Sequence, residues 1–351
     1  MALLKAGLWG DQVDLSAFPL SADEWTRVYE MSRRQTVSGL CYDAICQLPD
    51  ELLPPQEQLM KWLALAVGIE RTNAKMERAM VSLVGKFREL GLHPVVQKGH
   101  AVARFYERPE LRESGDIDLW FAESERGQLR DAAAKIGNRL SRRPDGSLTF
   151  QYGGFEVECH NTLVDLRHPY VRKAIDKLVE SQGFATVELE HGDVTIPAPI
   201  VELLMVDAHI MKHSFGVGVG LRQICDYARA AKALQGRYDA GEFRRLCREL
   251  HIDNWTAMLN GFVTEYLGAD PSTLPDPGRE SKVSPEKLMD IVKEGGNFGW
   301  YLPVRRRFMN RLVQRKMHTL YTFMKRIRFS SSLAPKEALW TTLKLLIGQI
   351  H

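Results

Sequence analysis

The sequence lacks the long hydrophobic run that a membrane-spanning helix needs. Its longest apolar stretches, such as Leu63 to Ile69, fall far short of the roughly 20 residues that cross a bilayer. The first residues reach Asp11 and Asp14 before any long apolar run or small-residue cleavage site, unlike a secretory signal. We therefore expect a cytoplasmic protein with no transmembrane segment.

Cysteine is scarce, with five residues, and no two of them are spaced C-x-x-C. Because the set is odd in number and scattered, we interpret these residues as reduced, buried thiols rather than a disulfide framework. A zinc site on Cys41 and Cys46 stays open as an alternative, although no second cysteine pair follows downstream. The composition, with 44% hydrophobic and 26% charged residues, excludes disordered and fibrous classes.

The net charge is small, at +3, but it is unevenly distributed along the chain. Residues 301–351 contain eleven basic residues and one acid, Glu337, so the first 300 residues are net acidic. From Arg305 to Arg328 the cations alternate with apolar residues, which is typical of an amphipathic helix. Three interpretations stay open for the charged face of this segment, which can meet water, nucleic acid or anionic lipid.

The pattern of apolar residues divides the chain into three regions. Residues 1–92 are predicted as an N-terminal helical region, with periodic apolar positions from Trp25 to Leu40 and from Leu59 to Leu92. Residues 93–197 alternate short strands with helices, and residues 198–351 are predicted as a C-terminal helical domain with a basic tail. We therefore expect an α+β fold, in which a small mixed β-sheet is flanked by helical segments at both ends.

Individual elements follow from the same patterns. Strands are expected over 94–97, 117–121, 148–152, 155–160, 185–190 and 193–197. Helices are expected from His100 and over 124–140, 200–213, 221–234, 241–250, 254–267 and 338–350, with a loop over 268–284. Gly153-Gly154 and His191-Gly192 are expected to turn two hairpins.

Two aspartates on one predicted strand form the most informative motif. Because side chains alternate along a strand, Asp116 and Asp118 point the same way while Ile117 and Leu119 enter the core. Two adjacent carboxylates repel each other unless a cation lies between them, and such an oxygen pair suits Mg²⁺. For an isolated D-x-D motif, a solvated strand end is the alternative interpretation.

A second predicted strand offers a third carboxylate. In Phe155 to His160 the same alternation puts Glu156, Glu158 and His160 on one face, close to the D-x-D strand in a compact sheet. Glu156 is nearer the hairpin turn, so Glu158 is the better candidate metal ligand. His160 has either a direct role in the site or a packed, hydrogen-bonded one.

The strand-turn-helix over Val95 to Phe105 has features that a phosphate group needs. Gly99 lets backbone amides approach an anion, a helix N-terminus follows from His100, and Lys98 adds a cation.

Arg112 is a second candidate phosphate ligand. It lies four residues before Asp116 and can hold a phosphate with its planar guanidinium. A surface ion pair with Glu110 or Glu113 is the alternative.

Together these motifs resemble the nucleotidyltransferase superfamily that includes DNA polymerase β and the aminoglycoside nucleotidyltransferases. More narrowly, they resemble a family of uncharacterised bacterial nucleotidyltransferases with a Lys-Gly turn, a Tyr-x-x-Pro-x-x-Arg segment, a D-I-D strand and a V-E-L-H-like strand. The matching segments are Lys98-Gly99, Tyr106–Arg112, Asp116–Asp118 and Val157–His160, followed by His209–His213 and Leu221–Asp226. The wider superfamily has Gly-Ser where this sequence has Lys98-Gly99-His100. The resemblance covers about residues 90–235.

The resemblance implies transfer of a nucleoside monophosphate from a nucleoside triphosphate to a hydroxyl acceptor, with release of pyrophosphate. It implies Mg²⁺ (or Mn²⁺) ions held by Asp116, Asp118 and Glu158, which position the triphosphate and activate the acceptor. The implied nucleotide contacts are Lys98, Gly99, His100 and Arg112. The base and the acceptor stay open, and the acceptor can be a small molecule, a saccharide, a protein or an RNA.

The downstream helices add candidate substrate contacts. His209 and His213 are four residues apart on a predicted helix and share a face. Metal binding, contact with nucleotide or acceptor, and plain packing all stay open for this pair, which has no H-E-x-x-H pattern. Asp226 either hydrogen-bonds across helices or orients Arg222.

Two rival functions stay open beside the enzyme. One is a non-catalytic nucleotide-binding or regulatory module with the same fold. The other is a nucleic-acid-associated protein that acts through the basic C-terminal segment.

Overall fold

A seven-stranded sheet surrounded by helices makes up the fold, in a computed structural model that describes residues 1–143, 145–216, 218–299, 301 and 312–346. The strands are β1 (Val95–Gln97), β2 (Asp116–Trp120), β3 (Asn138–Arg142), β4 (Leu148–Tyr152), β5 (Phe155–His160), β6 (Phe184–Leu189) and β7 (Gly192–Pro197). The helices that precede β7 are α1 (Ala2–Trp9), α2 (Ala22–Gln35), α3 (Ser38–Ile45), α4 (Gln56–Glu89), α5 (Gly99–Ala103), α6 (Arg126–Ile136) and α7 (Pro169–Gln182). The later ones are α8 (Pro199–Phe215), α9 (Leu221–Leu234), α10 (Ala240–Glu249), α11 (Asp253–Leu267), α12 (Glu286–Gly295), α14 (Leu312–Leu333) and α15 (Pro335–Leu346).

The strands lie in the order β3-β4-β5-β2-β1-β7-β6. Neighbours run antiparallel except in the β2–β5 and β1–β7 pairs, which are parallel. The sheet is therefore mixed, and helices precede and follow it along the chain. This arrangement confirms the predicted α+β class.

Period-two alternation gives the sheet one apolar face. In β2, Ile117 and Leu119 are buried in the same cluster as Val157 and Cys159 of β5. Their neighbours in sequence therefore point to the opposite face, where the polar residues of both strands lie.

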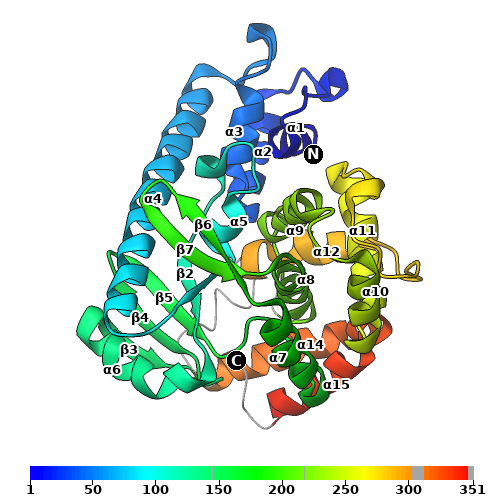
Figure 1. Cartoon of the computed structure of the whole chain (residues 1–351). Helices are drawn as coiled ribbons and strands as arrows, with labels where there is room; N and C mark the ends of the chain where they lie inside the picture. Colours follow the sequence, from blue (N-terminus) through cyan, green and yellow to red (C-terminus); the bar gives the residue numbers. More distant parts are fainter. Residues whose placement is uncertain (144, 217, 300, 302–311, 347–351) are drawn as a thin grey trace.

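The long helix α4 covers the apolar face of the sheet (Figure 1). Apolar residues at helical spacing along its second half, from Met76 to Phe87, pack against the strands together with α6. The ring of Phe87 lies 5.0 Å from that of Phe121 and 6.2 Å from that of Phe150, both edge-on. The end of the predicted N-terminal region thus belongs to the core of the sheet, and the boundary at residue 92 stays a prediction.

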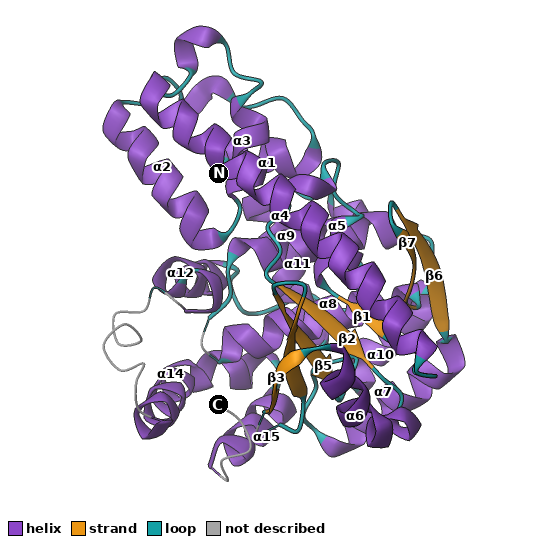
Figure 2. Cartoon of the chain, turned by 90° about the vertical axis from the view of Figure 1, so that its left-hand side faces the viewer, coloured by secondary structure: helices purple, strands orange, loops and turns teal. Residues whose placement is uncertain are grey.

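A second core lies among the helices on the other side of the sheet. Its buried residues come from α1–α3, from β1 and α5, and from the helices between α7 and α14. Figure 2 shows α1–α3 gathered at one end of the molecule, away from the strands. Helix α8 runs through this core, and its His209 and Lys212 lie beside Asp165 in the loop after β5.

Both predicted hairpins are confirmed, but two elements are not where the sequence pattern indicated. The helix predicted over 124–140 ends at Ile136, and Asn138–Arg142 forms the edge strand β3. This strand has no buried residue, so the apolar alternation that identifies a strand is missing. Helix α7, at Pro169–Gln182, lies in a segment with no predicted element, although Val171, Ile175 and Leu178 give it a buried stripe.

The C-terminal basic segment is described only in part. Its arginines from Arg305 to Arg311 lie outside the described residues, and α14 begins at Leu312. On α14, Arg326 is 4% exposed and donates to the carbonyls of Ser214 and Gly216 at the end of α8. At least one cation of this segment therefore holds helices together instead of facing water. Among the described residues, no helix is both long and apolar enough to span a bilayer.

The cysteines are free thiols, as predicted, and four of the five are buried. Cys46 is exposed, so the predicted burial is wrong for that residue. Within the described ranges, no group of three potential metal ligands includes a cysteine.

Candidate active site

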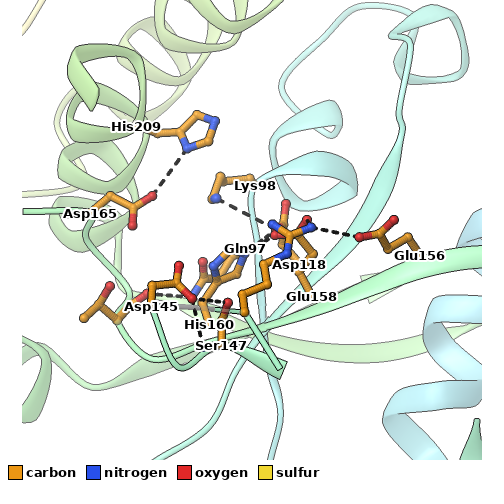
Figure 3. A network of polar contacts seen from close by, with 12 residues as sticks. Gln97, Lys98, Asp118, Asp145, Ser147, Glu156, Glu158, His160, Asp165 and His209 are labelled. Atoms are coloured by element: carbon orange, nitrogen blue, oxygen red, sulfur yellow. Dashed lines mark hydrogen bonds and ion pairs between the residues drawn. The ribbon is translucent and has the colours of Figure 1, made fainter. Parts of the chain in front are cut away.

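Three potential metal ligands converge on the polar face of the sheet, from Asp118 on β2 and from Glu158 and His160 on β5. The parallel pairing sets Asp118 directly opposite Glu158. One ligand atom from each of the three residues lies within 4.8 Å of the others. Figure 3 shows these side chains pointing toward one another, with Lys98 above them. The sequence predicted this shared face, and the pairing of β2 with β5 brings the two motifs together.

An ammonium and an imidazole lie close to Asp118. The Nζ atom of Lys98 lies 3.8 Å from its Oδ1, and the Nε2 atom of His160 lies 2.5 Å from the same oxygen. Burial alone would raise the pKa of Asp118, but Lys98 and His160 outweigh it and hold that pKa below its usual value. Burial lowers the pKa of Lys98 less than Asp118 and Asp165 raise it, so its ammonium stays charged. Asp118 is therefore ionised at neutral pH.

The other two predicted carboxylate ligands carry the opposite shift. The charge of Asp118, burial and Glu158 together raise the pKa of Asp116 to about 6. Burial and then Asp118 raise the pKa of Glu158. Repulsion among Asp116, Asp118 and Glu158 contributes to both shifts, and a bound metal ion would relieve that repulsion.

Asp116 lies at the start of β2, opposite Glu156, and is not part of the group of three ligand atoms. Glu156 is exposed and bonds to Arg143, whose guanidinium also reaches Glu158. Arg222 lowers the pKa of Asp116 from the side of α9. Asp116 thus faces the same side of the sheet as Asp118, at the edge of the cluster.

The Lys-Gly turn between β1 and α5 has a constrained backbone. Lys98 has a φ of 42° and Gly99 a φ of 46°, both in the left-handed region, which costs a lysine more than a glycine. The turn aims Lys98 at Asp118. Helix α5 is five residues long and begins at Gly99, one residue before the predicted start at His100. The ring of His100 turns away toward α4, where Nε2 lies 3.1 Å from the carbonyl oxygen of Asn73.

Arg112 has a partner that the sequence analysis did not consider. Its guanidinium is 5% exposed and donates twice to Asp226 of α9, over 2.7 and 2.6 Å. The hydroxyl of Tyr106 donates to the same carboxylate over 2.7 Å. Asp226 accepts from Nε and Nη2, and Nη1 donates to the carbonyl oxygen of Glu113 and the hydroxyl of Ser114. The guanidinium is therefore paired inside the protein, and the surface ion pair with the carboxylate of Glu110 or Glu113 is not seen. Asp226 in turn orients Arg112 rather than Arg222.

Arg222 is half-buried on α9 beside this pair. Its Nη1 donates to the carbonyl oxygen of Glu113 over 2.7 Å, and its Nε has no hydrogen-bond partner among the described residues. Burial and the charge of Arg112 lower its pKa. Arg222 is therefore a cation near Asp116 with an unused donor.

His209 and His213 of α8 lie next to the site through Asp165. Their rings stack edge-on with centroids 4.5 Å apart. Asp165 accepts from Lys212 over 3.0 Å, and its Oδ2 lies 3.6 Å from Nδ1 of His209 (Figure 3). Burial and the charge of Lys98 lower the pKa of His209 to about 4, so its imidazole is neutral at pH 7. In the part of the chain described here, neither histidine joins a group of three metal ligands.

Sequence reasoning missed two charged residues of the site. Asp165 lies in the loop after β5, where a single acid interrupts the buried run Leu163–Leu166; that isolated charge is the signal that could have identified it. Burial would raise the pKa of Asp165, yet Lys212 and His209 hold it well below the usual value. Arg143 follows the unpredicted strand β3, and no local pattern distinguishes it from Arg142.

Comparisons with known proteins give one family and one solved structure. The sequence model of a family described as uncharacterised nucleotidyltransferase matches residues 21–268. A solved structure, an antigenic nucleotidyltransferase-like protein from Paracoccidioides brasiliensis, aligns with this chain at 15% sequence identity and a TM-score of 0.34. The alignment covers 54% of this chain and 91% of the other one. No curated protein matches the chain.

Proposed function

The chain belongs to this family of uncharacterised nucleotidyltransferases, and we propose that it transfers a nucleoside monophosphate from a nucleoside triphosphate to a hydroxyl acceptor. The transfer releases pyrophosphate. The observation that carries the proposal is the convergence of Asp118, Glu158 and His160 within 4.8 Å, beside Lys98.

The donor set fits a divalent cation of the Mg²⁺ or Mn²⁺ type. Two carboxylates supply hard oxygen ligands, and the raised pKa values of Asp116 and Glu158 reflect negative charge that a cation would neutralise. Asp118 and Glu158 would hold the metal, and Asp116 would complete its ligands from the edge of the cluster. When bound, such a metal neutralises the triphosphate and lowers the pKa of a coordinated hydroxyl.

His160 acts in this proposal on Asp118 rather than as a ligand. Its Nε2–H donates to Oδ1 of Asp118 and so fixes which oxygens of that carboxylate face the metal. An imidazole in this position orients the ligand and keeps it ionised.

Lys98 and Arg222 are the proposed phosphate contacts of the chain itself. Lys98 already faces the carboxylates, so its ammonium can neutralise the triphosphate oxygens as charge develops on them. Arg222 has an unused Nε–H and lies close enough to Asp116 to lower its pKa. Arg112, which Asp226 occupies, instead holds the segment that leads into β2 against α9.

Neutral His209 and His213 line the α8 side of the site and are proposed contacts of the acceptor or base. A neutral imidazole both donates and accepts, and therefore suits hydroxyl or base edges better than phosphate. Asp165 keeps His209 in place from the opposite side.

The test is nucleotide transfer by purified protein with Mg²⁺ or Mn²⁺ and each of four α-labelled nucleoside triphosphates. Acceptor pools of RNA, saccharides, small hydroxyl compounds and the protein itself are supplied, and pyrophosphate release is measured in parallel. Wild-type protein should release pyrophosphate and label one pool, while Asp118→Asn should do neither. Arg130→Gln, an exposed change on α6, serves as the control and should behave like wild type.

A non-catalytic nucleotide-binding module is the competing function. It is favoured by the two internal partners of Asp118, Lys98 and His160, which already satisfy that carboxylate. Under this alternative, nucleotides raise the melting temperature in the presence of Mg²⁺, but pyrophosphate never appears with any acceptor pool. That combination would reject the enzyme and support the module.

A further inference from the structure

A basic groove of about 910 Å³ lies among the C-terminal helices and shares no residue with the carboxylate site. Its walls come from the end of α10, the start of α11, the loop that leads into α12, and the second half of α14. Figure 1 shows α10 and α11 beside α14 and α15 in the helical half of the molecule.

Positive charge dominates the groove. Its only lining carboxylate is Asp253, whereas its lining cations are Arg248, Arg279, Lys282, Lys287, Lys325 and Arg328. Arg279 pairs with Asp253 over 3.0 Å, and Lys325 pairs with Glu294. The other four cations are exposed, and no described carboxylate lies within ion-pair distance of them. Excess positive charge of this kind attracts an anionic ligand.

The groove is a built feature rather than a gap between helices. Asn254 donates to the carbonyl oxygen of Ser332 over 2.6 Å and so joins α11 to the end of α14. The ammonium of Lys336 donates to Nε2 of His251 over 2.5 Å and joins α15 to the turn after α10. These bonds hold the cation-bearing segments at fixed separations.

The arrangement of the four unpaired cations favours an extended polyanion. They come from four separate segments, α10, the 268–285 loop, the first turn of α12 and α14, so each segment presents a cation to successive charges of an extended ligand. Of the apolar lining residues, Val283, Phe329 and Leu333 are buried, at 8%, 9% and 1% exposure, and Pro335 is exposed. One exposed proline is a small apolar surface for insertion into a lipid layer.

An aromatic side chain beside the groove favours nucleic acid over other polyanions. Tyr321, Lys325 and Arg328 are spaced i, i+4 and i+7 on α14 and therefore share one helix face. Tyr321 is 65% exposed, so its ring is open to stack on a base. Aromatic stacking combined with a cationic groove is typical of proteins that bind single strands without reading their sequence.

We propose that this groove binds the phosphate backbone of single-stranded nucleic acid, with Tyr321 stacking on a base. The site is independent of nucleotidyl transfer. The groove places Lys325 and Arg328 of the basic C-terminal segment beside cations from residues 248–287. No sequence pattern connects those cations with the C-terminal segment.

The test measures binding of a fluorescently labelled 12-residue oligouridylate to the full chain by anisotropy, over a range of salt concentrations. Four unpaired cations predict a slope of about −3 for log K against log salt, at about −0.7 per phosphate contact. A variant with Arg248→Gln, Lys282→Gln, Lys287→Gln and Arg328→Gln should bind about tenfold or more weakly with a slope near zero. Tyr321→Ser should weaken binding about fivefold or more, without changing the slope.

The matched control removes the same charge elsewhere, through Lys75→Gln, Lys86→Gln, Lys173→Gln and Lys177→Gln, all exposed. Inorganic tripolyphosphate, polyglutamate and phosphatidylserine vesicles test other anions with the same proteins. The proposal is overturned if wild type fails to bind the oligonucleotide at 50 mM salt, or if the groove variant binds like the control. It is also overturned if polyglutamate or vesicles bind the groove more tightly than the oligonucleotide. Because this experiment measures oligonucleotide binding, a negative result would not bear on the proposed transfer activity. A negative result in the transfer assay would likewise not bear on the groove.

Discussion

Two clusters of buried charge lie a few residues apart along the chain, and their charges are balanced differently. In the first, Arg112 and Asp226 form a bidentate pair, and Tyr106 donates to the same carboxylate. In the second, Asp118 and Glu158 lie on adjacent strands with Lys98 as their nearest ammonium. The first cluster satisfies itself, and the second retains a surplus of negative charge.

The pKa shifts express this contrast. Burial lowers the pKa of Arg112, but Asp226 outweighs it and the pKa rises above its usual value, so the pair is stable as charged groups. Near Asp118, the pKa of Asp116 rises to about 6 and that of Glu158 also rises. A buried ion pair in which each charge has a partner stabilises the fold, whereas carboxylates with raised pKa values are typical of a ligand-binding or catalytic site.

The largest expected effect comes from breaking the matched pair. Asp226→Asn leaves the Arg112 guanidinium buried without a counter-charge, which should lower the free energy of unfolding by about 3–5 kcal/mol. Urea denaturation of the variant and the wild type measures this loss of unfolding free energy. The control is Arg108→Gln, whose partners Asp43 and Glu110 are surface carboxylates, and it should cost less than about 1 kcal/mol. Equal losses for the two variants would show that the buried Arg112–Asp226 pair stabilises the fold no more than a surface ion pair does.

Next in size is the loss of a carboxylate from the mismatched cluster. Glu158→Gln removes a proposed metal ligand, so transfer activity should fall at least about 100-fold, which corresponds to about 2.7 kcal/mol in the barrier. Because the change also removes a repelling charge, the melting temperature should stay the same or rise. Calorimetry and pyrophosphate release test both expectations, and a large drop in melting temperature would assign Glu158 a structural role.

A smaller effect concerns pH and metal. The pKa of Asp116 in the folded protein, about 6, lies above its usual value of 3.8, so the folded state binds this proton more tightly than the unfolded state does. The resulting gain in stability is complete below about pH 4 and is lost as the pH rises through 6. Mg²⁺ should offset that loss, by about 1.4 kcal/mol at ten times its dissociation constant, at pH 7.5. At pH 5 protons compete with the metal and the gain should shrink. A melting-temperature shift that is the same at both pH values, or that persists in Asp116→Asn, would count against a metal at this cluster.

The smallest expected effect concerns Arg143, which bonds to Glu156 and Glu158 and is 42% exposed. Arg143→Gln should change stability by less than about 1 kcal/mol, as for other exposed pairs. Because Glu158 loses a competing cation, Mg²⁺ should bind a few-fold more tightly in titration calorimetry. Arg142→Gln is the control, and weaker Mg²⁺ binding in the Arg143 variant would show that the guanidinium supports the site instead.

Local patterns predicted most of the site because its two motifs lie on strands. Alternation alone aligns Asp116 with Asp118, and Glu158 with His160, whatever the rest of the chain does. The hairpin at Gly153-Gly154 follows from glycine's access to positive φ, here 60° and 91°.

Residues outside regular strands escaped prediction for a physical reason. Asp165 lies on a loop and acquires its role only because α8 brings Lys212 and His209 beside it, 44 or more residues later in the chain. Arg143 follows an edge strand with no buried residue, so no hydrophobic period marks its position. The pairing of Arg112 with Asp226 spans 114 residues, and its charges had nearer partners in the sequence.

By itself, the sequence determined which side chains share a strand face and which segments bury apolar stripes, because both follow from the 2.0 and 3.6 periods of the backbone. Tertiary structure alone decided that β2 pairs with β5, which brings Asp118 opposite Glu158. It also decided that Asp226 pairs with Arg112, and that cations from four segments line one groove. Contacts between distant segments depend on how complete cores pack together, and no local period encodes that packing.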